Sequence, residues 1–211
     1  CVGARDHEGN LIGLLRARGW EPELVCKEGM PLAWGIEQVR VRKSVPSTVV
    51  VALGTNPGPV EDEFSERIAQ MREELRDRGA HEILWVNYSN RADGYRDKND
   101  ALLRSAVTNQ EIYVDWAARV RDNPHWFHRD GLHYGAAGRR AWARTIAEAT
   151  EVIPGHRPYF ARAVVPEVVR PPLALPRGDD RADGSSSRNT FGFAQLWCVT
   201  TCSAARTTAR H

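Results

Sequence analysis

The sequence predicts an α/β fold in which a mostly parallel sheet lies between two layers of helices. Strand-length apolar runs alternate with segments of helical period between residues 10 and 150. The run "STVVVALGTN", residues 47–56, is apolar without polar alternation, as in strands buried on both faces of a parallel sheet. Helix-length segments separate successive strands, and such crossovers join parallel neighbours. We therefore expect a three-layer domain.

The first half of the chain contains three helical patterns and two strands. "DHEGNLIGLLRARGW" predicts a helix that ends at Gly19, "PELVC" a strand, and "KEGMPLAWGIEQVRVR" a loop and a short helix. The clearest helix follows the apolar run, and its apolar residues recur at helical spacing: Phe64, Ile68, Met71 and Leu75. Acidic residues crowd its first turn, where the helix dipole favours them, and Gly79 ends it.

The second half repeats the alternation and then loses it. "HEILWVNY" predicts a strand, a polar loop leads to a helix from about Asn99 to Val107, and "EIYVDW" predicts another strand. The last helix starts near Ala136. From about Pro154 the chain is rich in Pro, Gly, Ser and charge, without a sustained period. We expect one domain over residues 1–155 and a poorly ordered tail over residues 156–211.

Composition and charge exclude several classes of function. The net charge of +2 comes from 29 basic and 27 acidic residues without a long block of one sign, so nucleic-acid binding is not predicted. No apolar run is long enough for a membrane helix and no signal peptide is recognisable, so the chain reads as soluble. Four scattered cysteines predict no disulfide framework, and Cys198 and Cys202 without a second pair predict no metal site.

Polar residues follow two of the expected strands. Asn56 follows "VVVALG", and "HRDGLHYGAAG", residues 128–138, follows "IYVDW". Ligands of open α/β sheets bind at the carboxyl ends of strands, so both places are candidate sites. Asp130, three residues before His133, can fix the imidazole tautomer and stabilise its cation, as a general base requires. The amide of Asn56 and the backbone N–H of Gly29 can hold a developing oxyanion.

Each of these residues also has a purely structural interpretation. Asp130 can cap the following helix and leave His133 as an incidental surface residue. Asn56 suits a turn before a proline. His125 and His128 add two imidazoles to the same segment, which leaves a metal site open as an alternative.

In their order and spacing these residues resemble the SGNH, or GDSL-type, hydrolase family. That family has four blocks: a Gly-Asp-Ser with the nucleophile, a Gly, a Gly-x-Asn and an Asp-x-x-His. The matching residues are Gly29 for the second block, Gly54 and Asn56 for the third, and Asp130 and His133 for the fourth. Further features resemble one branch of the family, whose domains often accompany membrane acyltransferases that acylate cell-surface glycans. These features are "VDW", Asn99 and "HYGAAGRRAWA". The likeness covers roughly residues 2–153.

The resemblance implies a flavodoxin-like domain that is a serine esterase or O-acyltransferase. Its substrate is an acyl ester, acetylated glycans among them. In that mechanism His133 takes the serine proton and Asp130 orients His133, while Asn56 and the N–H of Gly29 stabilise the oxyanion. The resemblance implies no metal and no organic cofactor. The charge balance predicts no nucleic-acid partner, and no membrane segment is recognisable in the sequence.

The first block has no counterpart in the sequence. In the family the nucleophilic serine lies a few residues before a segment like "VGAR", residues 2–5, so we expect it just upstream of Cys1. We expect the first strand, which the family places in the middle of the sheet, to be missing with it. The chain is then an inactive fragment of the enzyme. An N-terminal nucleophile at Cys1, or its thiol in the place of the serine, is an alternative.

A function of a different class fits the same residues, namely a non-catalytic domain whose cleft binds a glycan or a protein partner. Binding that is unaffected by His133→Ala would favour it. An in-frame Gly-Asp-Ser upstream of Cys1 would favour the enzyme. The compartment depends on the parent protein: extracytoplasmic for a domain severed from a membrane acyltransferase, and cytoplasmic for a freestanding enzyme.

Overall fold

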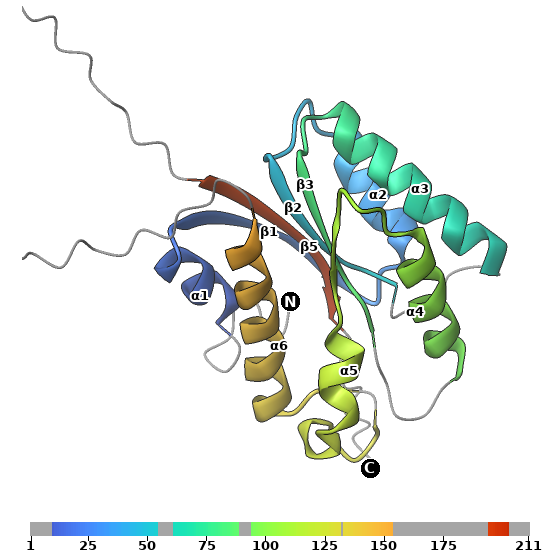
Figure 1. The fold of residues 1–211 in the computed structure, drawn as a ribbon, viewed down its shortest axis with the longest axis vertical. Helices are drawn as coiled ribbons and strands as arrows, with labels where there is room; N and C mark the ends of the chain where they lie inside the picture. The colour runs from blue at the N-terminus through green and yellow to red at the C-terminus, as the bar shows by residue number, and fades with distance from the viewer. Residues whose placement is uncertain (1–9, 55–60, 89–93, 132, 154–193, 203–211) are drawn as a thin grey trace, which may run out of the picture.

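The computed structural model describes residues 10–54, 61–88, 94–131, 133–153 and 194–202. In these residues the protein is mixed α/β, with helices around a parallel sheet (Figure 1). Strands β2 (Thr48–Ala52), β3 (Glu82–Val86) and β4 (Ile112–Val114) pair in parallel and in chain order. The expected alternation of strands and helices is therefore confirmed in this part of the chain.

The other elements lie close to the segments predicted for them. Strand β1 spans Trp20–Glu28, and the helices are α1 (Leu11–Ala17), α2 (Leu32–Arg40), α3 (Glu61–Asp77), α4 (Gly94–Ala106) and α6 (Ala136–Ala149). Three short helices were not predicted: α5 (Trp116–Arg121) and the 3₁₀ turns η1 (Pro124–Trp126) and η2 (Thr150–Val152). They are too short for a hydrophobic period to show.

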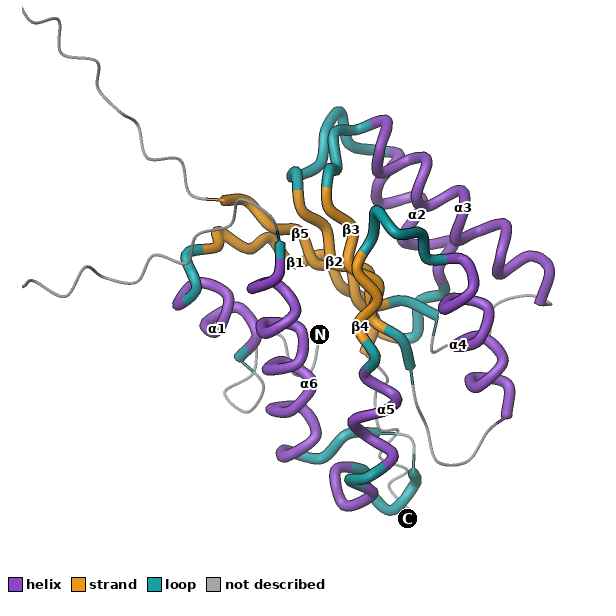
Figure 2. Tube along the Cα trace, viewed as in Figure 1, coloured by secondary structure: helices purple, strands orange, loops and turns teal. Residues whose placement is uncertain are grey.

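The strands bury alternate residues toward two groups of helices. Val50 and Ala52 of β2 pack in the core cluster that contains residues of α1, α5 and α6. Val49 and Val51 pack in the second cluster, with residues of α2, α3 and α4. Figure 2 shows the two groups on opposite sides of the strands. Successive side chains of a strand point to opposite faces, which explains why both sets of residues in "TVVVA" are buried.

The sheet contains a strand from the predicted tail. Its order is β1-β5-β2-β3-β4, and β5 is Ala194–Cys202. Figure 1 shows this strand, in red, between β1 and β2. It pairs in parallel with all nine residues of β1 and with five residues of β2. These nine residues belong to the segment expected to be a poorly ordered tail and form a strand in the structure, while the rest of that segment lies outside the described residues.

The position of β5 explains why composition did not reveal it. Within the described residues β1 and β2 pair through β5 and not with each other. Two strands with open edges offer backbone donors and acceptors to any segment that can extend between them. Such long-range pairing leaves no local sequence period. None of the helices in the described part of the chain has the length and apolar character needed to cross a membrane.

Candidate active site

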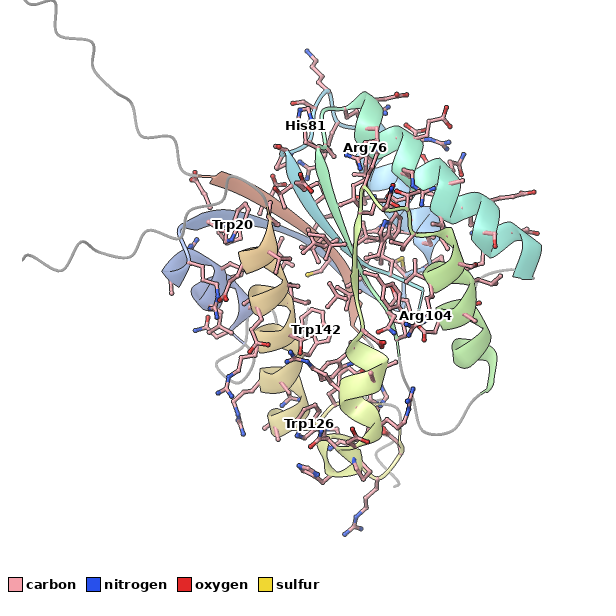
Figure 3. All side chains as sticks on the ribbon, viewed as in Figure 1. Trp20, Arg76, His81, Arg104, Trp126 and Trp142 are labelled. Carbon is pink, nitrogen blue, oxygen red and sulfur yellow. The ribbon has the colours of Figure 1, made fainter. Side chains whose placement is uncertain are left out.

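The parallel strands direct several residues of interest to one edge of the sheet. Gly29 directly follows β1, Asn87 follows β3 and Asp115 follows β4. Figure 3 shows Arg104 and Trp126 toward this end of the molecule, with Arg76 and His81 at the opposite end. This is the edge at which open α/β sheets bind ligands. The chain continues from β4 through α5 and η1 to the loop that contains Asp130 and His133.

The loop from Trp126 to Gly135 is closed on itself by backbone hydrogen bonds. Phe127 and Tyr134 form an antiparallel bridge, and the N–H of Gly135 donates to the carbonyl of Trp126 at 2.8 Å. The His128 N–H donates to the His133 carbonyl at 2.7 Å. Gly131 has a φ of 66°, in the left-handed region that glycine adopts at low cost. The loop is therefore held in a defined conformation near the start of α6.

Aromatic side chains of α5 and η1 pack against the same loop. The rings of Trp116 and Trp126 are stacked with centroids 5.5 Å apart, and Tyr134 meets Trp116 edge-on. The indole N–H of Trp116 donates to the Tyr134 hydroxyl at 2.7 Å. A Cβ at Gly138 would lie 2.5 Å from the Trp126 carbonyl, so α6 approaches the loop closely because this residue is glycine. Helix α5, η1 and α6 thus form one support for the loop.

Asp130 binds His133 with both carboxylate oxygens. Its Oδ2 lies 2.5 Å from Nδ1 of the imidazole, and its Oδ1 accepts the His133 backbone N–H at 3.0 Å. The helix-cap alternative for Asp130 is wrong, because the N-cap of α6 is Gly135 and receives no side-chain hydrogen bond. One carboxylate therefore fixes both the backbone and the ring of His133.

The other ring nitrogen of His133 is buried and has no hydrogen-bond partner among the described residues. The His133 side chain is 14% exposed, whereas that of Asp130 is 45% exposed. If Nδ1 carries the proton that Asp130 accepts, the neutral ring has a free lone pair on Nε2. A buried polar atom without a partner costs free energy, so such atoms are uncommon in folded proteins. The arrangement is suited to taking a proton from a group placed at Nε2.

The expected oxyanion residues are only partly described. Gly29 is exposed, with a φ of 70° and no atom within 4 Å of the place a Cβ would take. Asn56 lies outside the described residues. The structure therefore brings Asp130 and His133 together and places Gly29 at the same sheet edge. In the described ranges no three His, Cys, Asp or Glu side chains are grouped so as to hold a metal ion.

Gly54 lies two residues before Asn56 in the sequence, and its surroundings require glycine. Its φ is 121°, and a Cβ would lie 2.9 Å from Cε2 of Tyr88 and 3.0 Å from Cε2 of Phe64. Gly54→Ala should therefore lower the free energy of unfolding by about 3 kcal/mol, the sum of backbone strain and overpacking. Gly29→Ala is the matched control, since it has a positive φ in open space. Urea unfolding measures both, and equal losses would contradict the packing argument.

Sequence reasoning missed a network of polar side chains at the ends of β3 and β4. Asn87 is 1% exposed, and its amide donates to the Tyr113 hydroxyl at 2.6 Å and to Oδ1 of Asp115 at 2.9 Å. The Tyr113 hydroxyl donates to Asp100 at 2.6 Å. Arg104 donates to Oδ2 of Asp115 at 2.8 Å. The position of Asn87 directly after a strand, like that of Asn56, was the signal that could have found it.

Asn99 of α4 contacts the backbone of Gly54. It is 1% exposed, and its Nδ2 donates to the Gly54 carbonyl at 3.5 Å, a long hydrogen bond. Its Oδ1 is buried and, like Nε2 of His133, has no hydrogen-bond partner within the described ranges. The hydrogen bond from Nδ2 links α4 to Gly54, the glycine that matches the third block of the family pattern.

The Asp115 carboxylate makes folding stability depend on pH. Burial raises its pKa, but hydrogen bonds from Arg104, the Ala118 N–H and Asn87 hold the pKa below its ordinary value. The pKa of Glu74 is also lowered, chiefly by its hydrogen bond with Arg40. The unfolded chain then binds more protons, so the stabilisation is present above pH of about 4 and is lost as pH falls through the folded-state pKa values. Urea unfolding between pH 7 and pH 3 should show a flat upper range and a steep fall below, and Asp115→Asn should reduce the slope.

Comparison with known proteins assigns the chain to no family. No protein-family model matches it, and no curated protein is detectably similar to it in sequence. Its candidate function therefore depends on the residues and their geometry.

Proposed function

We propose that this chain carries the base half of an SGNH-type active site, which acts on acyl esters such as those of acetylated glycans. The observation that carries the proposal is the geometry of His133. Its Nδ1 is 2.5 Å from the Asp130 carboxylate, while its Nε2 is buried and has no partner in the part of the chain that the structure describes. A general base needs these two features together, one nitrogen held and the other free.

The reaction follows from this geometry when a serine hydroxyl is placed at Nε2. His133 accepts the hydroxyl proton as the oxygen attacks the ester carbonyl, and Asp130 stabilises the imidazolium that forms. The negative charge passes to the carbonyl oxygen, where the N–H of Gly29 and the amide of Asn56 are the proposed donors. His133 then returns the proton to the leaving alkoxide. Water, or the hydroxyl of an acceptor, releases the acyl group from the serine.

The strand order supports a flavodoxin-like, three-layer interpretation of the fold. Such domains have the order 2-1-3-4-5. The observed order β1-β5-β2-β3-β4 corresponds to it if β5 takes the place of the first strand. The carboxyl end of that central position lies between the ends of β1 and β2, close to Gly29 and Gly54. A nucleophile at the end of a central strand would reach the same sheet edge as His133.

The proposal is tested by supplying the first block. We expect the 211-residue chain not to hydrolyse 4-nitrophenyl acetate above the buffer rate. A chain extended upstream of Cys1 by a strand that ends in Gly-Asp-Ser should gain turnover. The added strand should also displace β5, so that limited proteolysis releases the segment containing Ala194–Cys202. An extended chain that folds with the added strand in the sheet and remains inactive would contradict the proposal.

A further inference from the structure

The arginines of the protein fall into two groups that differ in their partners. On and around α2, α3 and α4 each described arginine donates to a carboxylate or a backbone carbonyl; these are Arg40, Arg42, Arg67, Arg72, Arg76, Arg78 and Arg104. Most of them bind acidic residues of neighbouring elements. They are therefore used within the fold.

The elements around the candidate site carry arginines without such partners. Five are exposed and form no ion pair or hydrogen bond with any described residue: Arg16, Arg121, Arg129, Arg140 and Arg144. They lie on α1, at the end of α5, in the loop beside Asp130 and on α6. Helix α6 contacts α1, α5 and η1, so these elements form one side of the molecule. The acids on this side are few, and Glu148 and Glu151 are already paired with Arg119 and Arg18.

We propose that four of these arginines, Arg121, Arg129, Arg140 and Arg144, bind anionic groups of the substrate, so that the acyl ester is carried on a carboxylate-bearing glycan. Arg16 is not among them, because it lies just before the start of β1, at the opposite edge of the sheet. This inference rests on the proposed function. A guanidinium presents a planar fork of donors that matches a carboxylate, and an unpaired one needs no internal ion pair to be broken first. Arg129 directly precedes Asp130, and Arg140 and Arg144 lie one turn apart on α6. Groups spread over α5, the loop and α6 suit an extended chain of anionic units.

The charge of the rest of the protein favours a glycan over a nucleic acid. The chain has a net charge of only +2 and an isoelectric point of about 8.5, below the range typical of nucleic-acid-binding domains. Helix α3 on the opposite side is acidic, with seven acidic residues and three arginines. A densely charged polyanion would be repelled there. A glycan with one carboxylate per sugar unit is less densely charged, and the local arginines suffice for it.

The test is equilibrium binding to the full 211-residue chain, followed by fluorescence anisotropy. The probes are a labelled oligogalacturonate, a neutral maltooligosaccharide of the same length and a thymidine oligonucleotide. We expect the acidic glycan to bind best, with an affinity that falls as salt is added. The double variant Arg140→Glu, Arg144→Glu should weaken binding about tenfold or more. The control with the same change of net charge is Lys43→Glu, Arg67→Glu, which should bind like the unmodified chain.

Three results would overturn the inference: equal binding of acidic and neutral glycans, equal losses in the two double variants, or tighter binding of the oligonucleotide. Thermal melting of each variant shows whether it is folded. The two proposals can fail separately. If the extended chain hydrolyses the ester but the acidic glycan does not bind, this inference is overturned and the proposed function stands.

Discussion

His133→Ala should lower the turnover number of the extended, serine-containing chain by about 10⁴-fold. Without the imidazole no group removes the serine proton, and the remaining catalysis comes from the oxyanion donors and from binding. Asp130→Asn should cost about 10³-fold, since an amide cannot stabilise the imidazolium and can favour the wrong tautomer. Steady-state kinetics on 4-nitrophenyl acetate measures both effects.

The matched control for His133 is His128 in the same loop. His128 is exposed, and its backbone rather than its ring binds His133. His128→Ala should leave kcat within about threefold of the starting value, as expected for a surface substitution. If His128→Ala and His133→Ala reduced turnover equally, the loop would matter for folding and the base would lie elsewhere.

Arg72→Met should lower the free energy of unfolding by about 3 kcal/mol or more. Arg72 of α3 donates to both oxygens of Glu111 at 2.9 Å and to the Ala106 carbonyl at 2.7 Å. The Glu111 side chain is 0% exposed, whereas that of Arg72 is 23% exposed. Burial raises the pKa of Glu111, but Arg72 and the Thr108 N–H hold the pKa below its ordinary value. Removing the guanidinium leaves a buried carboxylate without its cation.

A surface pair on the same helix is the control for Arg72. Arg67 and Glu63 are an exposed i,i+4 pair at 3.2 Å, so Arg67→Met should cost about 0.5 kcal/mol. Adding Glu111→Gln to Arg72→Met should recover part of the loss, because the uncompensated charge is removed. Urea unfolding at pH 7 measures the three variants. Equal costs for Arg67→Met and Arg72→Met would show that burial adds nothing to the Arg72 pair.

The sequence predicts the local parts of this fold better than the long-range ones. The spacing of Phe64, Ile68, Met71 and Leu75 predicts α3, and all four side chains are buried. Strand β2 is predicted from its continuous apolar run, because burial on both faces leaves no polar alternation. Strand β5 is not predicted, since its place depends on the open edges of β1 and β2 rather than on its own period.

In the candidate site, too, the sequence predicts a local contact but not the long-range ones. The short spacing of Asp130 and His133 allows their contact to be predicted, and the structure has it. The burial of Nε2 could not be predicted, because it depends on the three-dimensional packing around the loop. The polar network around Asn87 joins residues of β3, β4 and α4 that are far apart in sequence. Only the three-dimensional arrangement reveals which strand-end residues share it.

The rate of covalent labelling by a fluorophosphonate tests the central claim most directly, because this reagent reacts with a serine only when a base activates it. We predict that the extended chain takes up one phosphonyl group at the Gly-Asp-Ser serine, and that the 211-residue chain takes up none. His133→Ala in the extended chain should slow the labelling at least about 10³-fold. Labelling of the extended chain at the same rate with and without His133 would show that this histidine is not the base.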